Sequence, residues 1–202
     1  MEVLCADVGS VKRENFGWFA RLSDGTERKG SDIHELAECV AALLIEGKSV
    51  ALGFEAPMYV PLRKDVLTLT SKRRGETNAN WIGGPGASVL ATGLVQVPWL
   101  LSKVREKMRR PARAVLDWAD FRSGAAELFL WEAFVSGAAK GGSHIEDAEI
   151  AVNAFLRDLP NPGNDTEFSD PEVLSLLGVF LLRTGWRDEL SVLSERCLVV
   201  KA

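Results

Sequence analysis

The chain has 202 residues, which suits one domain of ordinary size or one domain with a small appendage. Hydrophobic residues make up 47% and charged residues 26%, the usual balance for a soluble globular protein. The net charge of −4 excludes a strong overall positive field for a polyanionic partner, although local basic clusters can still provide one.

The cysteines and the apolar stretches argue against disulfides and membrane spans. Cys5, Cys39 and Cys197 are odd in number, far apart and embedded in apolar segments, which favours buried reduced thiols. No Cys or His pair has the spacing of a zinc site. No leader precedes the first predicted strand, and the longest apolar stretch, residues 89–101, is too short to span a bilayer. We therefore expect a cytoplasmic protein with no membrane association.

The first third of the chain predicts the order β-β-β-α-β. Short apolar runs bounded by Gly or Pro predict strands, a Ser-Asp-Gly turn predicts a hairpin, and apolar residues at helical spacing predict a helix. The predicted elements are strands at residues 2–8, 15–22, 26–29 and 49–54 and a helix over residues 33–44. We expect the strand that leads to Glu55 to lie beside the strand that contains Asp7.

The remainder alternates irregular and regular segments. From residue 58 to residue 98 the periodic pattern breaks down, and a long irregular stretch in a compact domain is usually a functional loop or a disordered one. The predicted elements are a helix beginning near residue 87, helices over 100–108, 144–156 and 171–183, and strands over 127–135 and 195–201. The Pro- and Gly-rich run at 160–165 predicts a linker.

Acidic residues stand at the ends of two predicted buried strands. Asp7 ends the first, and Glu55 ends the strand after the first helix. Open α/β sheets form their ligand crevices at the carboxyl ends of strands. His144 and Asp147 are three residues apart at the start of a predicted helix, so they share one helix face. If this helix crosses the sheet with its N-terminus at that edge, Asp147 meets Asp7 and Glu55.

A cluster of three carboxylates suits a divalent cation. Like charges a few ångströms apart raise one another's pKa, and a cation relieves that repulsion. All-oxygen ligands favour Mg²⁺ or Mn²⁺, and two such ions can activate a water molecule and stabilise the leaving oxygen of a phosphodiester. Each acid alone has an ordinary explanation as a turn residue or in the first turn of a helix. Their joint positions favour a catalytic site.

The order of these motifs resembles the RNase H-like superfamily, and within it the RuvC-type resolvases and uncharacterised bacterial families of the same clan. The resemblance covers residues 1–156, and Asp7, Glu55 and the His144-x-x-Asp147-Ala pattern carry it. It implies an α/β fold, with an RNase H-like mixed β-sheet flanked by helices, completed here by a C-terminal helix and strand. It also implies a nuclease that uses Mg²⁺ or Mn²⁺, with Asp7, Glu55 and Asp147 holding metal, Asp7 bridging two ions, and His144 orienting water or contacting the scissile phosphate.

The chain departs from the minimal fold of that superfamily. We expect one domain over residues 1–202, with a long insertion at 58–113 and a C-terminal extension at 165–202. Glu132 could supply an additional acid on the strand before the last helix of the core fold, or it could equally face solvent. Whether the catalytic set is intact therefore stays open.

Basic clusters offer candidate contacts for DNA or RNA. Such clusters neutralise phosphates, although a solvated helix face is an equally good interpretation. The candidate contacts are Lys72, Arg73, Arg74, Arg105, Arg109 and Arg110. Trp81 and Trp99 could stack on bases, but tryptophans at such positions are more often part of a core.

Two other functions remain open. A non-catalytic RNase H-like interaction module agrees with the net negative charge and the uncertain fourth acid. One half of an actin-like or sugar-kinase-like ATPase would share the Asp-x-Gly opening, but two such halves are needed and this chain is too short for both. An even-numbered assembly such as a homodimer would suit a resolvase.

Overall fold

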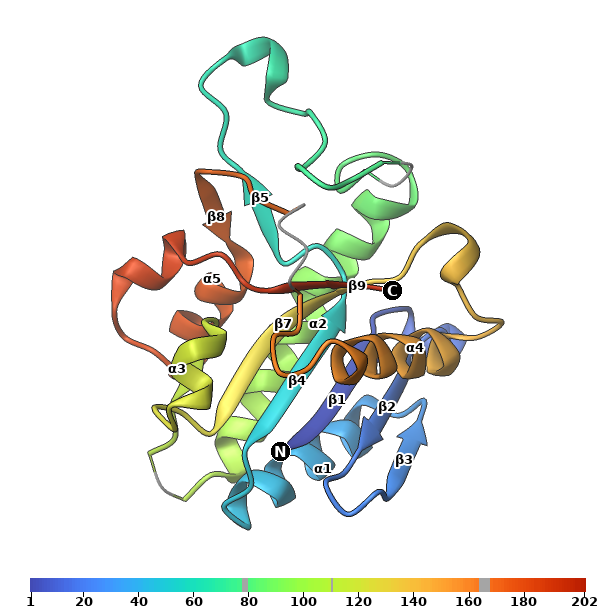
Figure 1. Cartoon of the computed structure of the whole chain (residues 1–202), viewed down its shortest axis with the longest axis vertical. Helices are drawn as coiled ribbons and strands as arrows, with labels where there is room; N and C mark the ends of the chain where they lie inside the picture. Colours follow the sequence, from blue (N-terminus) through green and yellow to red (C-terminus); the bar gives the residue numbers. More distant parts are fainter. Residues whose placement is uncertain (78–79, 110, 164–167) are drawn as a thin grey trace.

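The structure, a computed structural model, describes residues 1–77, 80–109, 111–163 and 168–202. A mixed seven-stranded sheet runs through its centre, with helices on both faces (Figure 1). Its strand order is β3-β2-β1-β4-β7-β6, and β9 pairs with β7 beyond the end of β6. The predicted α/β class with a mixed sheet and flanking helices is confirmed.

The elements fall into a central sheet, flanking helices and a small second sheet. The strands of the central sheet are β1 (Glu2–Asp7), β2 (Gly17–Arg21), β3 (Glu27–Gly30), β4 (Val50–Glu55), β6 (Ala114–Val115), β7 (Leu128–Phe134) and β9 (Val199–Lys201). The helices are α1 (Ile33–Ile45), α2 (Pro85–Lys107), α3 (Trp118–Arg122), α4 (His144–Arg157) and α5 (Leu176–Arg183). The second sheet pairs β5 (Tyr59–Pro61) with β8 (Val173–Ser175), and short 3₁₀ turns are η1 (Val11–Arg13), η2 (Val66–Thr68), η3 (Gly137–Ala139) and η4 (Leu190–Ser194).

The centre of the sheet brings the predicted acidic strand ends together. β1 pairs with β2 in antiparallel and with β4 in parallel orientation, and β4 continues in parallel to β7. In this register Asp7 lies opposite both Gly17 and Glu55. The prediction that the strands leading to Asp7 and Glu55 are neighbours is therefore confirmed.

Each face of the sheet carries its own hydrophobic core, because successive side chains of a strand point to opposite faces. On one face Leu4, Leu52 and Leu130 pack with the apolar sides of α1, α2 and α5. On the other face the cluster contains Trp131, and it packs with α3 and with Phe155 of α4. Figure 1 shows α4 crossing this second face in front of β1 and β2.

Two predictions for the later segments are wrong. The predicted helix over residues 171–183 begins only at α5, after Ser175, because the residues before it pair as β8 with β5. The two helical segments predicted near residue 87 and over 100–108 are one helix, α2, which continues through Pro98. An internal proline costs about 3 kcal/mol. Val97, Leu100, Leu101 and Val104 are fully or almost fully buried and offset that cost.

α2 is the one helix among the described residues that is long and apolar enough to cross a membrane. Its 23 residues extend beyond the stretch of residues 89–101 that the sequence singled out. That property rests on length and composition alone, which is weak evidence for a membrane span. In the structure one side of α2 packs against α1 and α5, while 28% of its most apolar window is buried.

Candidate functional site

Asp7 and Glu55 form a buried carboxyl pair at the carboxyl ends of β1 and β4. They are in register, so both side chains lie on the face of the sheet that α4 covers. Asp7 is 1% exposed and Glu55 is 9% exposed. A hydrogen bond joins the two side chains, in which protonated Glu55 donates to the Asp7 carboxylate. The pair therefore shares one proton.

His144 reaches Asp7 because a glycine lies between the sheet and the beginning of α4. His144 Nδ1 is 2.5 Å from Asp7 Oδ2. Gly17, opposite Asp7 in the sheet, lies so close to α4 that a Cβ atom there would be 2.4 Å from the carbonyl carbon of His144. Ser143 caps the helix by accepting a hydrogen bond from the amide of Glu146. Gly17 and this cap together fix where the imidazole lies.

Asp147 is held at the same site by the loop that precedes α4. Its Oδ1 atom accepts a 2.7 Å hydrogen bond from the amide of Gly141, and its Oδ2 atom lies 3.3 Å from Lys140 Nζ. The same ammonium group lies 3.5 Å from Glu55 Oε1. Because both distances end at Lys140 Nζ, Glu55 Oε1 and Asp147 Oδ2 are no farther apart than the sum of the two distances. The four residues predicted as a site, Asp7, Glu55, His144 and Asp147, lie together.

The electrostatics of the site give the two buried carboxyl groups, Asp7 and Glu55, clearly different pKa values. Burial raises the pKa of Asp7 from 3.8 to about 6, while its hydrogen bond with Glu55 and the charge of Lys140 limit the rise. Burial, together with the charge of Asp7, raises the pKa of Glu55 from 4.5 to about 9. At neutral pH Asp7 is thus mostly ionised and Glu55 is protonated. Asp147 contributes a further negative charge that raises both pKa values.

The donor set suits a hard cation, although the present side-chain positions do not form a coordination shell. Three carboxyl groups and an imidazole are ligands that Mg²⁺ and Mn²⁺ accept. In the described part of the chain, no three Asp, Glu, His or Cys side chains have the geometry to hold an ion. The Lys140 ammonium lies between Glu55 and Asp147 and supplies the positive charge there. Before a metal ion could bind here, the Lys140 ammonium group would have to move away and Glu55 would have to release its proton to solvent.

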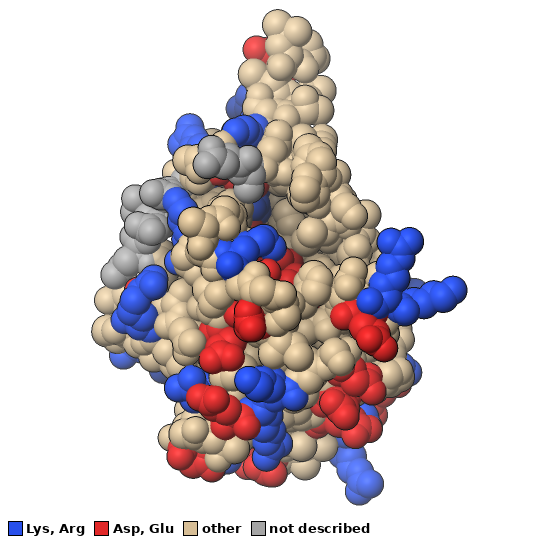
Figure 2. All heavy atoms as spheres, turned by 90° about the vertical axis from the view of Figure 1, so that its right-hand side faces the viewer, with Lys and Arg blue, Asp and Glu red and all other residues tan. Residues whose placement is uncertain are grey.

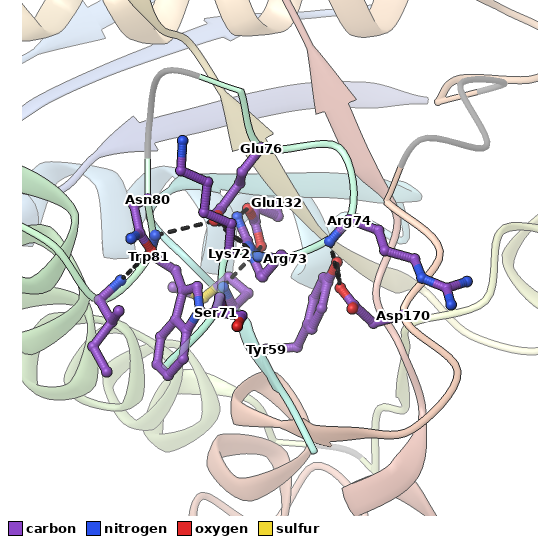
Figure 3. Close-up of polar contacts among 12 residues, drawn as sticks. Tyr59, Ser71, Lys72, Arg73, Arg74, Glu76, Asn80, Trp81, Glu132 and Asp170 are labelled. Atoms are coloured by element: carbon purple, nitrogen blue, oxygen red, sulfur yellow. Dashed lines mark hydrogen bonds and ion pairs between the residues drawn. The ribbon is translucent and has the colours of Figure 1, made fainter. Parts of the chain in front are cut away.

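Glu132 is buried and does not belong to this acidic cluster. It lies opposite Phe54 in the sheet, so its side chain points to the face opposite that of Asp7 and Glu55. There Arg73 binds both of its carboxylate oxygens, at 2.8 and 2.6 Å, and the amide of Met58 donates a third hydrogen bond (Figure 3). The prediction left open whether Glu132 joins the acids or faces solvent, and neither alternative is correct.

Arg73 is wrongly predicted as a nucleic-acid contact. It is 2% exposed, and its Nε atom donates to Glu76 while its other two nitrogens donate to Glu132. The guanidinium also lies over the rings of Tyr59 and Phe168, at 4.7 and 5.3 Å from their centroids. Each of its three side-chain nitrogens donates within the fold and the side chain is buried, so the guanidinium is not accessible to a phosphate.

The other predicted basic contacts are near the surface. Lys72 and Arg74 are exposed, and their side chains donate to the carbonyls of Thr77 and Ser169, respectively. Arg105 is half-buried over Trp186, and Arg109 is exposed. Arg110 lies outside the described residues, as do positions 164 and 165 of the predicted linker.

The two candidate stacking residues, Trp81 and Trp99, are buried and half-buried, respectively. Trp81 is 9% exposed and donates its indole N–H to the carbonyl of Ser71. Trp99 is half-buried and makes an edge contact with His34. The interpretation of these residues as core tryptophans therefore fits Trp81 better than Trp99.

The candidate site opens on two sides. A cavity of about 570 Å³ adjoins Glu55 and Lys140, and a groove of about 450 Å³ adjoins His144 and Asp147. Acidic and basic side chains are interspersed on the molecular face shown in Figure 2, below an almost uncharged projection. A ligand could therefore approach the carboxylates from either side, without a field of one sign to guide it.

Lys140 and Gly17 are the site residues that sequence reasoning missed. Lys140 directly precedes the Gly-Gly-Ser entry to the helix of His144 and Asp147, so its position in the chain was a usable signal. Gly17 carried no such signal, because its role depends on the distance between β2 and α4. No protein-family model, curated protein or solved structure matches the chain.

Proposed function

We propose that this protein is a divalent-metal-dependent nuclease with an RNase H-like fold that hydrolyses phosphodiester bonds of DNA or RNA. The strand order β3-β2-β1-β4-β7, with an antiparallel hairpin followed by parallel strands, supports the fold assignment. The observation that carries the function is the convergence of Asp7, Glu55, His144 and Asp147, from three distant chain segments, at one edge of the sheet. Ligand sites of open α/β sheets form at this edge.

In such a reaction the acidic residues, His144 and Lys140 would have different roles. Asp7, Glu55 and Asp147 would hold Mg²⁺ or Mn²⁺, which when bound supply a Lewis acid for water activation and for the leaving oxygen. His144 is 39% exposed at its side chain and hydrogen-bonded to Asp7, so it can orient a water molecule or the phosphate and carry a proton. Lys140, released from Glu55 and Asp147, would face the substrate's phosphates as a positive charge.

Titration calorimetry with Mn²⁺, together with cleavage assays on DNA and RNA in Mg²⁺ and in EDTA, tests the proposal. Asp7→Asn should abolish Mn²⁺ binding and cleavage, because it removes the carboxylate at the centre of the cluster. Glu2→Gln is the matched control, since Glu2 is a buried acid of the same strand that binds Ser23 at the opposite end. Equal Mn²⁺ binding by wild type and Asp7→Asn would refute the metal site.

A second candidate function is a non-catalytic interaction module of the same fold. Lys140 favours it, because its ammonium group already lies beside Asp147 and Glu55, where an ion would otherwise supply the positive charge. A module of this kind should bind no Mn²⁺ at millimolar concentrations and should cleave neither nucleic acid. The calorimetric titration of the wild-type protein therefore separates the two functions directly.

A further inference from the structure

The cavity beside Glu55 is built from the insertion, the beginning of α2 and the ends of β4 and β7. Its volume is about 570 Å³, within the range of small-molecule sites in proteins. Its walls are mainly apolar and include Trp81, Val89, Phe134 and Val135. Glu55 and Lys140 stand at the side of the cavity that meets the candidate catalytic cluster.

Buried hydrogen bonds hold the walls of this cavity. Glu76 accepts hydrogen bonds from the amides of Arg73 and Trp81, and the Trp81 indole donates to Ser71 (Figure 3). Arg73 in turn binds Glu132 on β7, so the loop and the sheet are joined beneath the cavity. The cavity is therefore preformed, as ligand sites usually are.

The charges that line the cavity exclude a phosphate from its interior. Among the described residues of the lining, Arg73 donates three side-chain hydrogen bonds, to Glu76 and Glu132. With the ammonium group of Lys140 at the side of the cavity, two positive charges face the two carboxylates, so the lining has no excess positive charge to hold a phosphate in the interior. A flat, uncharged ring suits such a site, because Trp81 and Phe134 offer aromatic surfaces and Ser136 offers a hydroxyl that makes no capping hydrogen bond.

We propose that this cavity receives the base of the nucleotide next to the phosphodiester that is cleaved. The inference rests on the proposed nuclease function, and it adds a subsite that fixes how the strand lies on the carboxylates. The phosphate would stay at Lys140 and the acidic cluster, while the base enters the apolar cavity. Aromatic side chains that stack on bases in this way bind all four bases with modest preference.

A pair of variants on one helix tests the subsite. Val89→Phe places a ring in part of the cavity, next to Trp81, where the base would lie, and Val95→Phe makes the same change at a position of α2 that is 69% exposed and does not line the cavity. The probes are a short single-stranded DNA and the same DNA with one abasic position, titrated in EDTA so that no cleavage occurs. Thermal unfolding checks that both variants fold.

We expect wild type and Val95→Phe to bind the intact strand about tenfold more tightly than the abasic strand. Val89→Phe should bind both strands equally, while its Mn²⁺ affinity stays that of wild type. The subsite is refuted if Val89→Phe keeps the preference of the wild type, or if wild type does not distinguish the strands. Failure of the nuclease proposal looks different, because Mn²⁺ then fails to bind while the base preference and its loss in Val89→Phe persist.

Discussion

Glu55 shows how strongly the environment of a single residue can change its chemistry. An exposed glutamate is ionised at neutral pH, but burial beside Asp7 keeps this one protonated, with a pKa of about 9. The pKa of Lys140 nearby also departs from its usual value. Partial burial lowers this pKa, but the charges of Glu55 and Asp147 raise it by more, so the net change is upward. The site therefore combines three carboxyl groups, one of them protonated at neutral pH, with the ammonium group of Lys140, so these four groups together keep an excess of negative charge.

The stability of the metal-free protein should fall as the pH rises. The folded-state pKa of Glu55 is raised above its usual 4.5, so its contribution is fully present below pH 4.5 and is lost as the pH passes through about 9. Asp7 acts in the same direction between 3.8 and about 6. In EDTA, Glu55→Gln should remove a slope of at most about 1.4 kcal/mol per pH unit from the free energy of unfolding, in the range from about pH 6 to about pH 9. Parallel profiles of wild type and Glu55→Gln in urea denaturation would contradict this.

Removing the ammonium group of Lys140 should make room for a cation. Lys140→Met leaves Asp147 without its present counter-charge, so Mn²⁺ no longer competes with the ammonium group at Asp147 and Glu55. We expect the Mn²⁺ affinity to rise about two- to fivefold, a modest change because Lys140 is 47% exposed at its side chain. Lys103→Met is the control, since Lys103 pairs with Glu106 on α2. A lower Mn²⁺ affinity of Lys140→Met would show that Lys140 supports the ion rather than replaces it.

At the scale of elements, the contact between α4 and β2 decides whether the site exists. α4 was predictable in type and position from its Gly-Gly-Ser entry and its apolar spacing, and so were β1, α1, β4 and β7. The separation of α4 from β2 was not predictable, because it depends on a glycine 127 residues earlier in the chain than His144. Similarly, β8 forms only because β5 lies beside it, and the helical pattern predicted over residues 171–183 could not reveal that partner.

Gly17→Ala should therefore open the site without touching any of its polar groups. The new methyl group would overlap the backbone of His144, so α4 must move away and His144 must lose its contact with Asp7. We expect a destabilisation of about 1–3 kcal/mol and a shifted imidazole signal of His144 in NMR spectra, where His34 is the only other histidine.

The matched control is Gly142→Ala, at the same end of α4. A Cβ atom there meets only the carboxylate of Glu146, a flexible side-chain end, at 3.3 Å. The His144 signal of this variant should stay at its wild-type position. If Gly17→Ala also leaves that signal unchanged, the glycine does not determine the position of the imidazole.

At the scale of the whole molecule, the segment of residues 58–113 contacts both the central sheet and the C-terminal segment. β5 pairs with β8, Arg63 lies 2.8 Å from Asp170, and Arg73 joins the insertion to β7. The sequence showed Arg73 only as one member of a basic run, which is why it was assigned to a nucleic acid. Its partner Glu132 lies 59 residues away, and pairing over that distance cannot be read from composition.

Arg73→Met should destabilise the whole molecule by about 3–5 kcal/mol, because it leaves Glu76 and Glu132 buried without a counter-charge. The cost arises from those two charges, so adding Glu76→Gln and Glu132→Gln to Arg73→Met should restore part of the stability. Arg74→Met, at the exposed neighbour, should change the free energy of unfolding by less than about 0.5 kcal/mol. Urea denaturation of the four proteins measures all of these differences. A small effect of Arg73→Met would mean that the insertion folds independently of β7, and the preformed cavity above Arg73 would then lose its structural basis.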